Sequence, residues 1–162
     1  MGRTLTAGAA VSLVAVVALA EGCTFIQPET GDRISACVDG DSDPANAIEF
    51  KTRIRPLMNG EKPGTKGCAA CHYSTSPNQA GQEGLIATQL DLSSLRTLRN
   101  GGVNTRGTIV VPGKPCSSAI VQKLRGTANG ARMPKNGPYW SPEDIQLVAD
   151  WIAEGANGGD DE

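Results

Sequence analysis

The sequence predicts an all-α domain of short helices, and two observations support this prediction. The segment from Ser141 to Gly155 has the signals of an amphipathic helix, because Ser141 suits the N-cap, Pro142 suits the first helical position and apolar residues recur at helical spacing through Ile152. The other segments with apolar residues at helical spacing, described below, are short and are bounded by Gly and Pro. A chain of 162 residues is expected to form one domain.

The first helix is predicted to run from Pro44 to Leu57. Asp43 suits its N-cap, and Pro44 suits its first position. An imperfect apolar stripe follows, and Pro56 together with Gly60 is expected to end the helix. This helix should pack near the last one.

Two shorter helices are expected in the middle of the chain, over residues 94–100 with Ser93 as the cap and over residues 115–124 with Pro115 at the first position. Residues 73–89 show little periodicity and are predicted to form a loop. Residues 157–162 are predicted to form a disordered acidic tail. The domain itself is therefore expected to span residues 44–156.

The run Cys68-Ala69-Ala70-Cys71-His72 carries the clearest chemistry in the sequence. Two cysteines separated by two residues and followed by histidine form the attachment signature of a c-type haem. Both thiols can form thioethers with the haem vinyl groups, and His72 can then bind the iron from the same turn. The sequence thus predicts one covalently attached haem c, with the short helices wrapped around it.

The second axial ligand is predicted to be Met133. His72 is the only histidine of the chain, so a second imidazole from this chain is excluded. Met133 lies in Arg132-Met133-Pro134, within a segment rich in Gly and Pro that suits an extended chain over a haem face. Met58 and an open iron are the alternatives. A thioether opposite an imidazole raises the reduction potential and fills both axial positions.

Other interpretations of the same residue types are open. Cys68, Cys71, His72 and one further cysteine could form a structural zinc site, although adjacent Cys71 and His72 are awkward ligands for one tetrahedral metal. The two cysteines could also form a simple disulfide. The alternating Asp39, Asp41 and Asp43 resemble the start of a calcium loop, but Pro and Phe stand where such a loop needs Gly and Glu.

Residues 1–22 are predicted to be a signal peptide. A basic start is followed by an apolar run of about 14 residues, shorter than the roughly 20 residues that a membrane-spanning helix needs. Cleavage is expected before Glu21 or before Cys23. The second site resembles a lipoprotein box, so Cys23 is a candidate for lipidation and for membrane anchoring. The protein is expected to be exported to the periplasm.

The remaining cysteines bear on this choice of cleavage site. With Cys68 and Cys71 assigned to haem, Cys23, Cys37 and Cys116 are left, an odd number for an oxidising compartment. If Cys23 carries lipid, Cys37 and Cys116 can pair. In the alternative, a soluble periplasmic protein joins Cys23 to Cys37 and leaves Cys116 free.

Charge is divided along the chain. Residues 29–49, which overlap a predicted acidic linker over residues 23–43, carry six acidic residues and one basic residue. Residues 51–135 carry thirteen basic and three acidic residues, and the chain from residue 143 onward carries seven acidic residues. The basic middle favours acidic redox partner proteins through electrostatic steering, unless folding mixes these charges. Nucleic acid is not an expected partner of an exported protein.

The order of these motifs resembles a class I bacterial cytochrome c, and within that class the planctomycete-type cytochrome c domains. The resemblance covers residues 48–156 and is carried by the haem motif and by Arg132-Met133-Pro134, with support from runs such as Leu90-Asp91-Leu92 and Trp151-Ile152-Ala153-Glu154-Gly155-Ala156. It implies an all-α haem domain with His72 proximal and Met133 distal, and attachment of the haem outside the cytoplasmic membrane. It also implies a backbone carbonyl that holds the His72 ring, expected near Pro77.

The sequence therefore predicts a monohaem electron carrier and not an enzyme. One alternative is a haem protein that binds or senses a small ligand at an open or labile distal site. Another is a surface lipoprotein in which the haem domain serves assembly.

Overall fold

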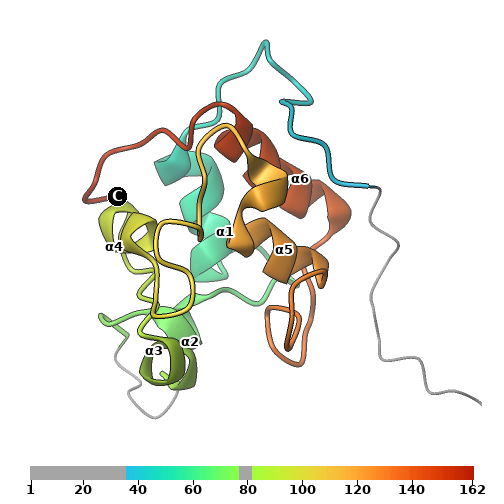
Figure 1. Ribbon diagram of the computed structural model, residues 1–162. Helices are drawn as coiled ribbons and strands as arrows, with labels where there is room; N and C mark the ends of the chain where they lie inside the picture. The colour runs from blue at the N-terminus through green and yellow to red at the C-terminus, as the bar shows by residue number, and fades with distance from the viewer. Residues whose placement is uncertain (1–35, 77–81) are drawn as a thin grey trace, which may run out of the picture.

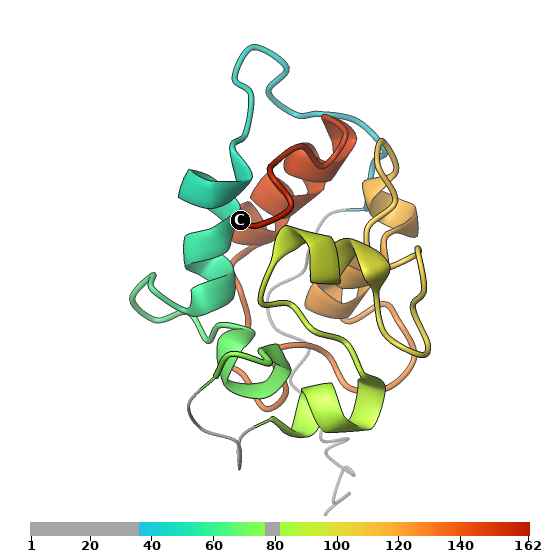
Figure 2. The same ribbon diagram turned by 90° about the vertical axis from the view of Figure 1, so that its left-hand side faces the viewer.

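The protein is described here from a computed structural model, over residues 36–76 and 82–162. These residues form helices and turns, with no strand among them, as the sequence predicted. In chain order the elements are a π-helical turn η1 (Phe50–Ile54), α1 (Arg55–Asn59), α2 (Ala69–His72), α3 (Glu83–Thr88), α4 (Leu95–Asn100), a 3-10 turn η3 (Pro115–Ser117), α5 (Ala119–Arg125) and α6 (Pro142–Ala153). Figures 1 and 2 show α2 and α3 side by side at one end of the domain, away from α6.

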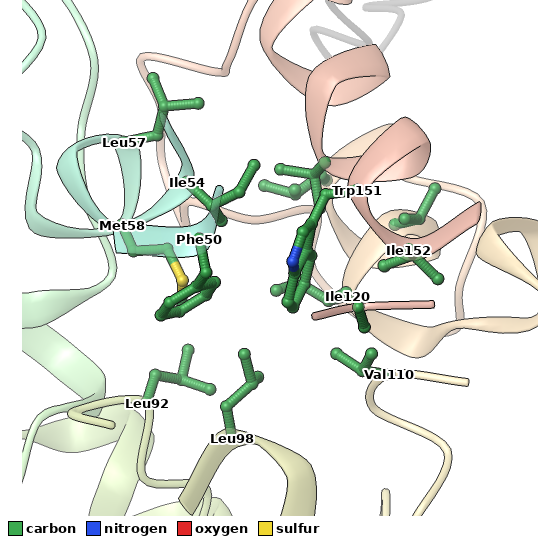
Figure 3. Close-up of a cluster of buried hydrophobic side chains, with 14 of the residues drawn as sticks. Phe50, Ile54, Leu57, Met58, Leu92, Leu98, Val110, Ile120, Trp151 and Ile152 are labelled. Atoms are coloured by element: carbon green, nitrogen blue, oxygen red, sulfur yellow. The ribbon is translucent and has the colours of Figure 1, made fainter. Parts of the chain in front are cut away.

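The core is built around α6. Trp151 is fully buried, and its ring packs against that of Phe50 with the centroids 5.1 Å apart. Met58, Leu92 and Leu98 lie around this pair (Figure 3), so the core joins α6 to η1, α1 and α4. The first and last helical segments therefore pack together, as the sequence predicted.

The predicted signals of the last helix are confirmed. The Ser141 Oγ accepts a hydrogen bond from the Asp144 amide at 3.2 Å, and Pro142 occupies the first turn. The helix ends at Ala153, and Gly155 adopts a φ of 103°, which only glycine reaches without strain. Ile145, Val148, Trp151 and Ile152, the predicted apolar face, are all buried.

The predicted start of the first helix at Pro44 is wrong. Residues 44–49 are not helical, and the helical segment begins at Phe50. In a helix from Pro44, the Ile48 amide would bond within the helix, but it donates to Glu154 Oε2 at 2.7 Å instead. Asp43 closes a turn by accepting from the Asn46 amide at 3.1 Å.

The predicted end of this helix needs one correction. Pro56 does not stop it but lies in the first turn of α1, which directly follows the π-helical turn η1. The helix continues to Asn59 and ends at Gly60, whose φ is 77°. Gly60 is therefore the stop signal, as predicted.

The middle helices differ from prediction in detail. The α4 helix is present, but Ser94 and not Ser93 caps it, through a capping box with Thr97. The predicted helix over 115–124 is divided into η3 and α5, with Ile120, Val121 and Leu124 buried as expected. The predicted loop over residues 73–89 contains a helix, α3, that the sequence did not indicate.

The N-terminal part of the described chain is fixed to the domain. Cys37 and Cys116 form a disulfide across 79 sequence positions. Asp39 Oδ1 accepts from the Cys116 amide at 2.8 Å, and the Ser42 hydroxyl donates to Asp150. The predicted signal peptide, its predicted cleavage sites and Cys23 lie outside the described residues. Within the described part of the chain, no helix has the length and apolar character needed to cross a membrane.

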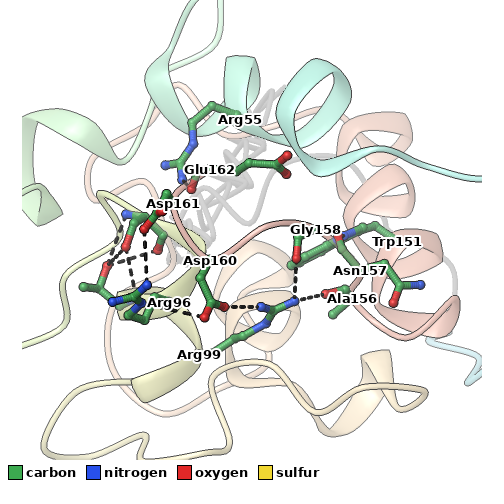
Figure 4. A network of polar contacts seen from close by, with 12 residues as sticks. Arg55, Arg96, Arg99, Trp151, Ala156, Asn157, Gly158, Asp160, Asp161 and Glu162 are labelled. Atoms are coloured by element: carbon green, nitrogen blue, oxygen red, sulfur yellow. Dashed lines mark hydrogen bonds and ion pairs between the residues drawn. The ribbon is translucent and has the colours of Figure 1, made fainter.

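The acidic C-terminal segment is ordered, which corrects the prediction of disorder. Asp160 pairs with Arg99 at 2.8 Å, and Asp161 with Arg96 at 3.3 Å (Figure 4). The Arg96 amide also donates to the Asp160 carbonyl at 3.0 Å. Part of the basic middle of the sequence is therefore neutralised by the acidic end of the same chain, which reduces the basic charge available to a partner.

Candidate haem-attachment site

The Cys68–His72 motif forms a single helical turn, with Cys68 as the N-cap of α2. The Cys68 amide donates to the Met58 carbonyl at 2.6 Å, which fixes the motif to the end of α1. Gly67 lies so close to Gly60 that a Cβ on Gly67 would come within 2.3 Å of the Gly60 nitrogen. This contact closes loop 61–66 at its base. The His72 amide then donates to the Cys68 carbonyl at 2.9 Å, so both cysteines and the histidine share one turn.

The His72 ring is held by a backbone carbonyl. Its Nδ1 lies 3.1 Å from the Leu90 oxygen. A carbonyl only accepts, so Nδ1 carries the proton and the lone pair is on Nε2. Burial lowers the pKa of His72 against the opposing effect of the Leu90 carbonyl, which favours the neutral imidazole that a metal requires. The expected position of this carbonyl near Pro77 is corrected to Leu90.

A second segment, Leu90 to Ser93, supports the histidine. The Leu92 amide donates to the His72 carbonyl at 2.9 Å, so this segment holds both the ring and the backbone of His72. Asp91 fixes the segment in turn, since it accepts from the Ser74 hydroxyl at 2.6 Å and from the Ser93 amide at 2.9 Å. Burial alone would raise the pKa of Asp91, but these hydrogen bonds outweigh it and lower the pKa.

The two motif thiols are free of any disulfide. Burial raises the pKa of the Cys68 thiol to about 12, with Arg55 opposing and Cys71 assisting the change. At neutral pH Cys68 is therefore a protonated thiol with little of the thiolate character that thiol redox centres use. The interpretation of the motif as a simple disulfide finds no support in this arrangement.

Gly84 of α3 lies directly against the His72 ring. A Cβ at this position would come within 2.5 Å of both Cε1 and Nε2 of His72, and within 2.9 Å of the Cys71 carbonyl. Only glycine permits this approach, because the ring could turn away only by giving up its bond to Leu90. The α3 backbone therefore packs against the edge of the imidazole that carries Cε1 and Nε2.

Replacing Gly84 by alanine should destabilise the domain. Overpacking of this kind costs about 1–3 kcal/mol. Replacing Gly by Ala in a helix gains at most about 1 kcal/mol in helix propensity, so we expect the cost of the contact to dominate. Urea unfolding measures the change, and Glu83→Ala, at the neighbouring exposed position of α3, is the control. A Gly84→Ala protein more stable than the wild type would contradict the described contact.

Met133 lies on a different segment, the connection between α5 and α6. It is half-buried, and its amide donates to the Lys123 carbonyl at 3.0 Å. The same connection is tied to the chain just before the motif, because Lys66 Nζ donates to the Lys135 carbonyl and Trp140 Nε1 donates to the Lys66 carbonyl, each at 2.9 Å. Met58, the alternative ligand, is fully buried in the apolar core (Figure 3).

An open pocket of about 450 Å³ lies between these two segments. Lys62 and Thr65 line it from the loop before the motif, and Arg132, Tyr139 and Trp140 line it from the connection that carries Met133. Lys62 is paired with Asp144 at 2.6 Å. Neither His72 nor Met133 lines this pocket, so it lies beside the loop before the motif and not at the predicted iron ligands.

The described residues do not complete a zinc site. Cys37 and Cys116 are joined to each other, so neither can be the fourth ligand of a zinc site. Among residues 36–76 and 82–162, no three His, Cys, Asp or Glu side chains converge as metal ligands, which also leaves Asp39, Asp41 and Asp43 without a calcium site. One turn with two free thiols and an imidazole oriented through Nδ1 suits a group that is attached covalently and bound through Nε2.

Three supporting features were not named as site residues from sequence. The Leu90 carbonyl is a backbone group without a side-chain signal, although it lies in the Leu90-Asp91-Leu92 run that supports the resemblance. Gly84 has no distinguishing signal, because the sequence contains 20 glycines. Arg55, on α1, carries no sequence signal of its own, and only the folded chain brings it beside Tyr73.

Comparison of the chain with models of protein families, with curated proteins and with solved structures finds no match.

Proposed function

We propose that this protein is a monohaem c-type cytochrome that transfers electrons between redox partners. The proposal is carried by one observation: Cys68, Cys71 and His72 share one turn, and the Leu90 carbonyl holds the His72 ring so that Nε2 is the free nitrogen. Metal-binding histidines are typically oriented in this way by a bond to their other nitrogen. A bound haem would supply an iron that takes up and releases one electron.

The chain's own residues would have distinct roles toward this group. Cys68 and Cys71 attach it through thioethers, and His72 binds it as the proximal ligand. Met133 is proposed as the distal ligand, since its connection is hydrogen-bonded to the segment that leads into the motif. With both axial positions filled, the protein would act as an electron carrier and not as an enzyme. The fold proposed for the loaded protein is that of a class I cytochrome c.

The compartment and partners follow from the same proposal. The haem would be attached outside the cytoplasmic membrane, with the protein in the periplasm and anchored through lipidated Cys23. The Cys37–Cys116 disulfide favours this arrangement, because it removes Cys37 as a partner for Cys23 and suits an oxidising compartment. The proposed partners are acidic redox proteins, although the tail neutralises part of the basic surface.

The proposal is tested by the absorption spectrum of the exported protein and by a pyridine haemochrome assay. We expect one covalently bound haem c per chain and a ferrous form that does not bind carbon monoxide. Met133→Ala should bind carbon monoxide readily, because its distal position is open. Met58→Leu, a volume-conserving core change, should keep the wild-type spectrum.

Two results would decide against parts of this proposal. A wild-type ferrous protein that binds carbon monoxide readily would favour the ligand-binding or sensing alternative over the electron carrier. Absence of covalent haem from protein exported by cells that assemble other c-type cytochromes would contradict the proposal as a whole.

A further inference from the structure

Arg55 occupies a central position between the ends of the chain and the candidate haem site. It is half-buried on α1. Its guanidinium carbon lies 4.8 Å from the Phe50 ring centroid and 5.8 Å from that of Tyr73. The side chain is therefore held between two aromatic rings, one in the core and one on the residue that directly follows His72.

The guanidinium donates to two segments that flank His72. Nη1 donates to the Tyr73 hydroxyl at 2.9 Å and to the Leu92 carbonyl at 3.0 Å. The Leu92 amide in turn donates to the His72 carbonyl. Arg55 thus links the residue after His72 with the segment whose Leu90 carbonyl orients the imidazole.

The other end of the guanidinium is held by the C-terminal strap, residues 158–162. Arg55 Nη2 donates to the Glu162 carbonyl, and the Leu95 amide donates to the same oxygen at 2.7 Å. Figure 4 shows Arg55 facing Glu162, with Arg96 and Arg99 holding the rest of the strap. The strap therefore fixes the orientation of the guanidinium that faces Tyr73 and Leu92.

We propose that Arg55 is a positioning residue for His72, which holds the two segments on either side of the imidazole through the fixed fork of its guanidinium. This inference deepens the proposed haem function and rests on it for its consequence at the iron. The planar fork is essential to the proposal, because Nη1 donates on both sides of His72 while Nη2 is held by the strap. A lysine carries the same charge on one nitrogen, which cannot make both sets of contacts in this geometry.

Amide hydrogen exchange tests the positioning with or without a haem. In Arg55→Lys, exchange at Leu92 should be about tenfold faster or more, because the bond from Arg55 to its carbonyl is lost. Exchange at Ile145 and Val148 of α6, in the core away from the His72 segment, should remain close to that of the wild type. Arg53→Lys, at an exposed position two residues earlier, is the matched control.

The reduction potential tests the consequence for the iron. In haem-loaded protein, Arg55→Lys should shift the potential, and Arg53→Lys should leave it unchanged. Deletion of residues 158–162 should have an effect on Leu92 exchange that does not add to that of Arg55→Lys, since both act through one guanidinium.

The outcomes separate this inference from the proposed function. Equal acceleration of exchange at every amide would make Arg55 merely structural, and an Arg55→Lys protein indistinguishable from wild type would show that charge alone matters. Either result overturns the inference while the cytochrome proposal stands. A chain without haem would overturn the proposed function, and the exchange result would still decide whether Arg55 positions His72.

Discussion

Replacing both Cys68 and Cys71 by alanine should leave the exported protein without covalently attached haem. Each thiol is free, and both lie on the single turn that ends in His72, with Cys68 as the N-cap of α2 and Cys71 within it. Without thioethers, any haem would be held only by its axial ligands and by apolar contacts. Acid–acetone extraction, which removes such haem, should therefore strip the double variant completely and leave the wild type coloured.

The single variants and one control sharpen this test. Cys68→Ala and Cys71→Ala each retain one thiol and should attach less haem than the wild type, through one thioether. Ala70→Ser changes an exposed residue between the cysteines and should attach haem normally. Haem that resists extraction from the double variant would show that the motif is not the attachment site.

Among the variants proposed for this protein, the one without the Cys37–Cys116 disulfide should lose the most free energy of unfolding. The bond closes a loop of 79 sequence positions, and its constraint on the unfolded chain is worth about 4.5 kcal/mol in the chain-entropy description. A typical domain is stable by only about 5–15 kcal/mol. The double variant Cys37→Ala/Cys116→Ala should therefore unfold at a much lower urea concentration than the wild type.

The control for this experiment is Ser117→Ala, next to Cys116 at an exposed position. It should change the free energy of unfolding by no more than about 0.5 kcal/mol. A loss below about 1 kcal/mol in the double variant would mean that the disulfide constrains the unfolded chain far less than its span suggests. The haem content of the variant should stay unchanged, because neither cysteine belongs to the attachment motif.

The sequence predicted those parts of the fold that depend on local signals. Ser141, Pro142 and the apolar face of α6 act within one helix, and all are found as expected. The Cys68 to His72 turn is likewise local. For the candidate site, the sequence predicted that these residues share one turn, and their role in haem attachment is a proposal.

The features that the sequence did not predict depend on contacts between distant residues. The first helix does not start at Pro44 because Glu154, 106 positions further on, accepts the hydrogen bond of the Ile48 amide. The acidic tail is ordered because Arg96 and Arg99 lie beside it only in the folded chain. The Leu90 carbonyl, which holds the His72 ring, is a backbone atom that any residue type would provide.

The close contact between Gly60 and Gly67 has a consequence for how this domain can vary. Because the two glycines meet at the base of loop 61–66, and the Cys68 amide is bonded to the Met58 carbonyl beside them, the position of the haem motif does not depend on the length of the loop. Doubling the length of a flexible loop costs only about 0.6 kcal/mol in closure entropy. Insertions here would change the rim of the neighbouring pocket, which Lys62 and Thr65 line, while leaving His72 in place. The architecture thus allows related chains to diversify the surface near the ligand turn without rebuilding the turn itself.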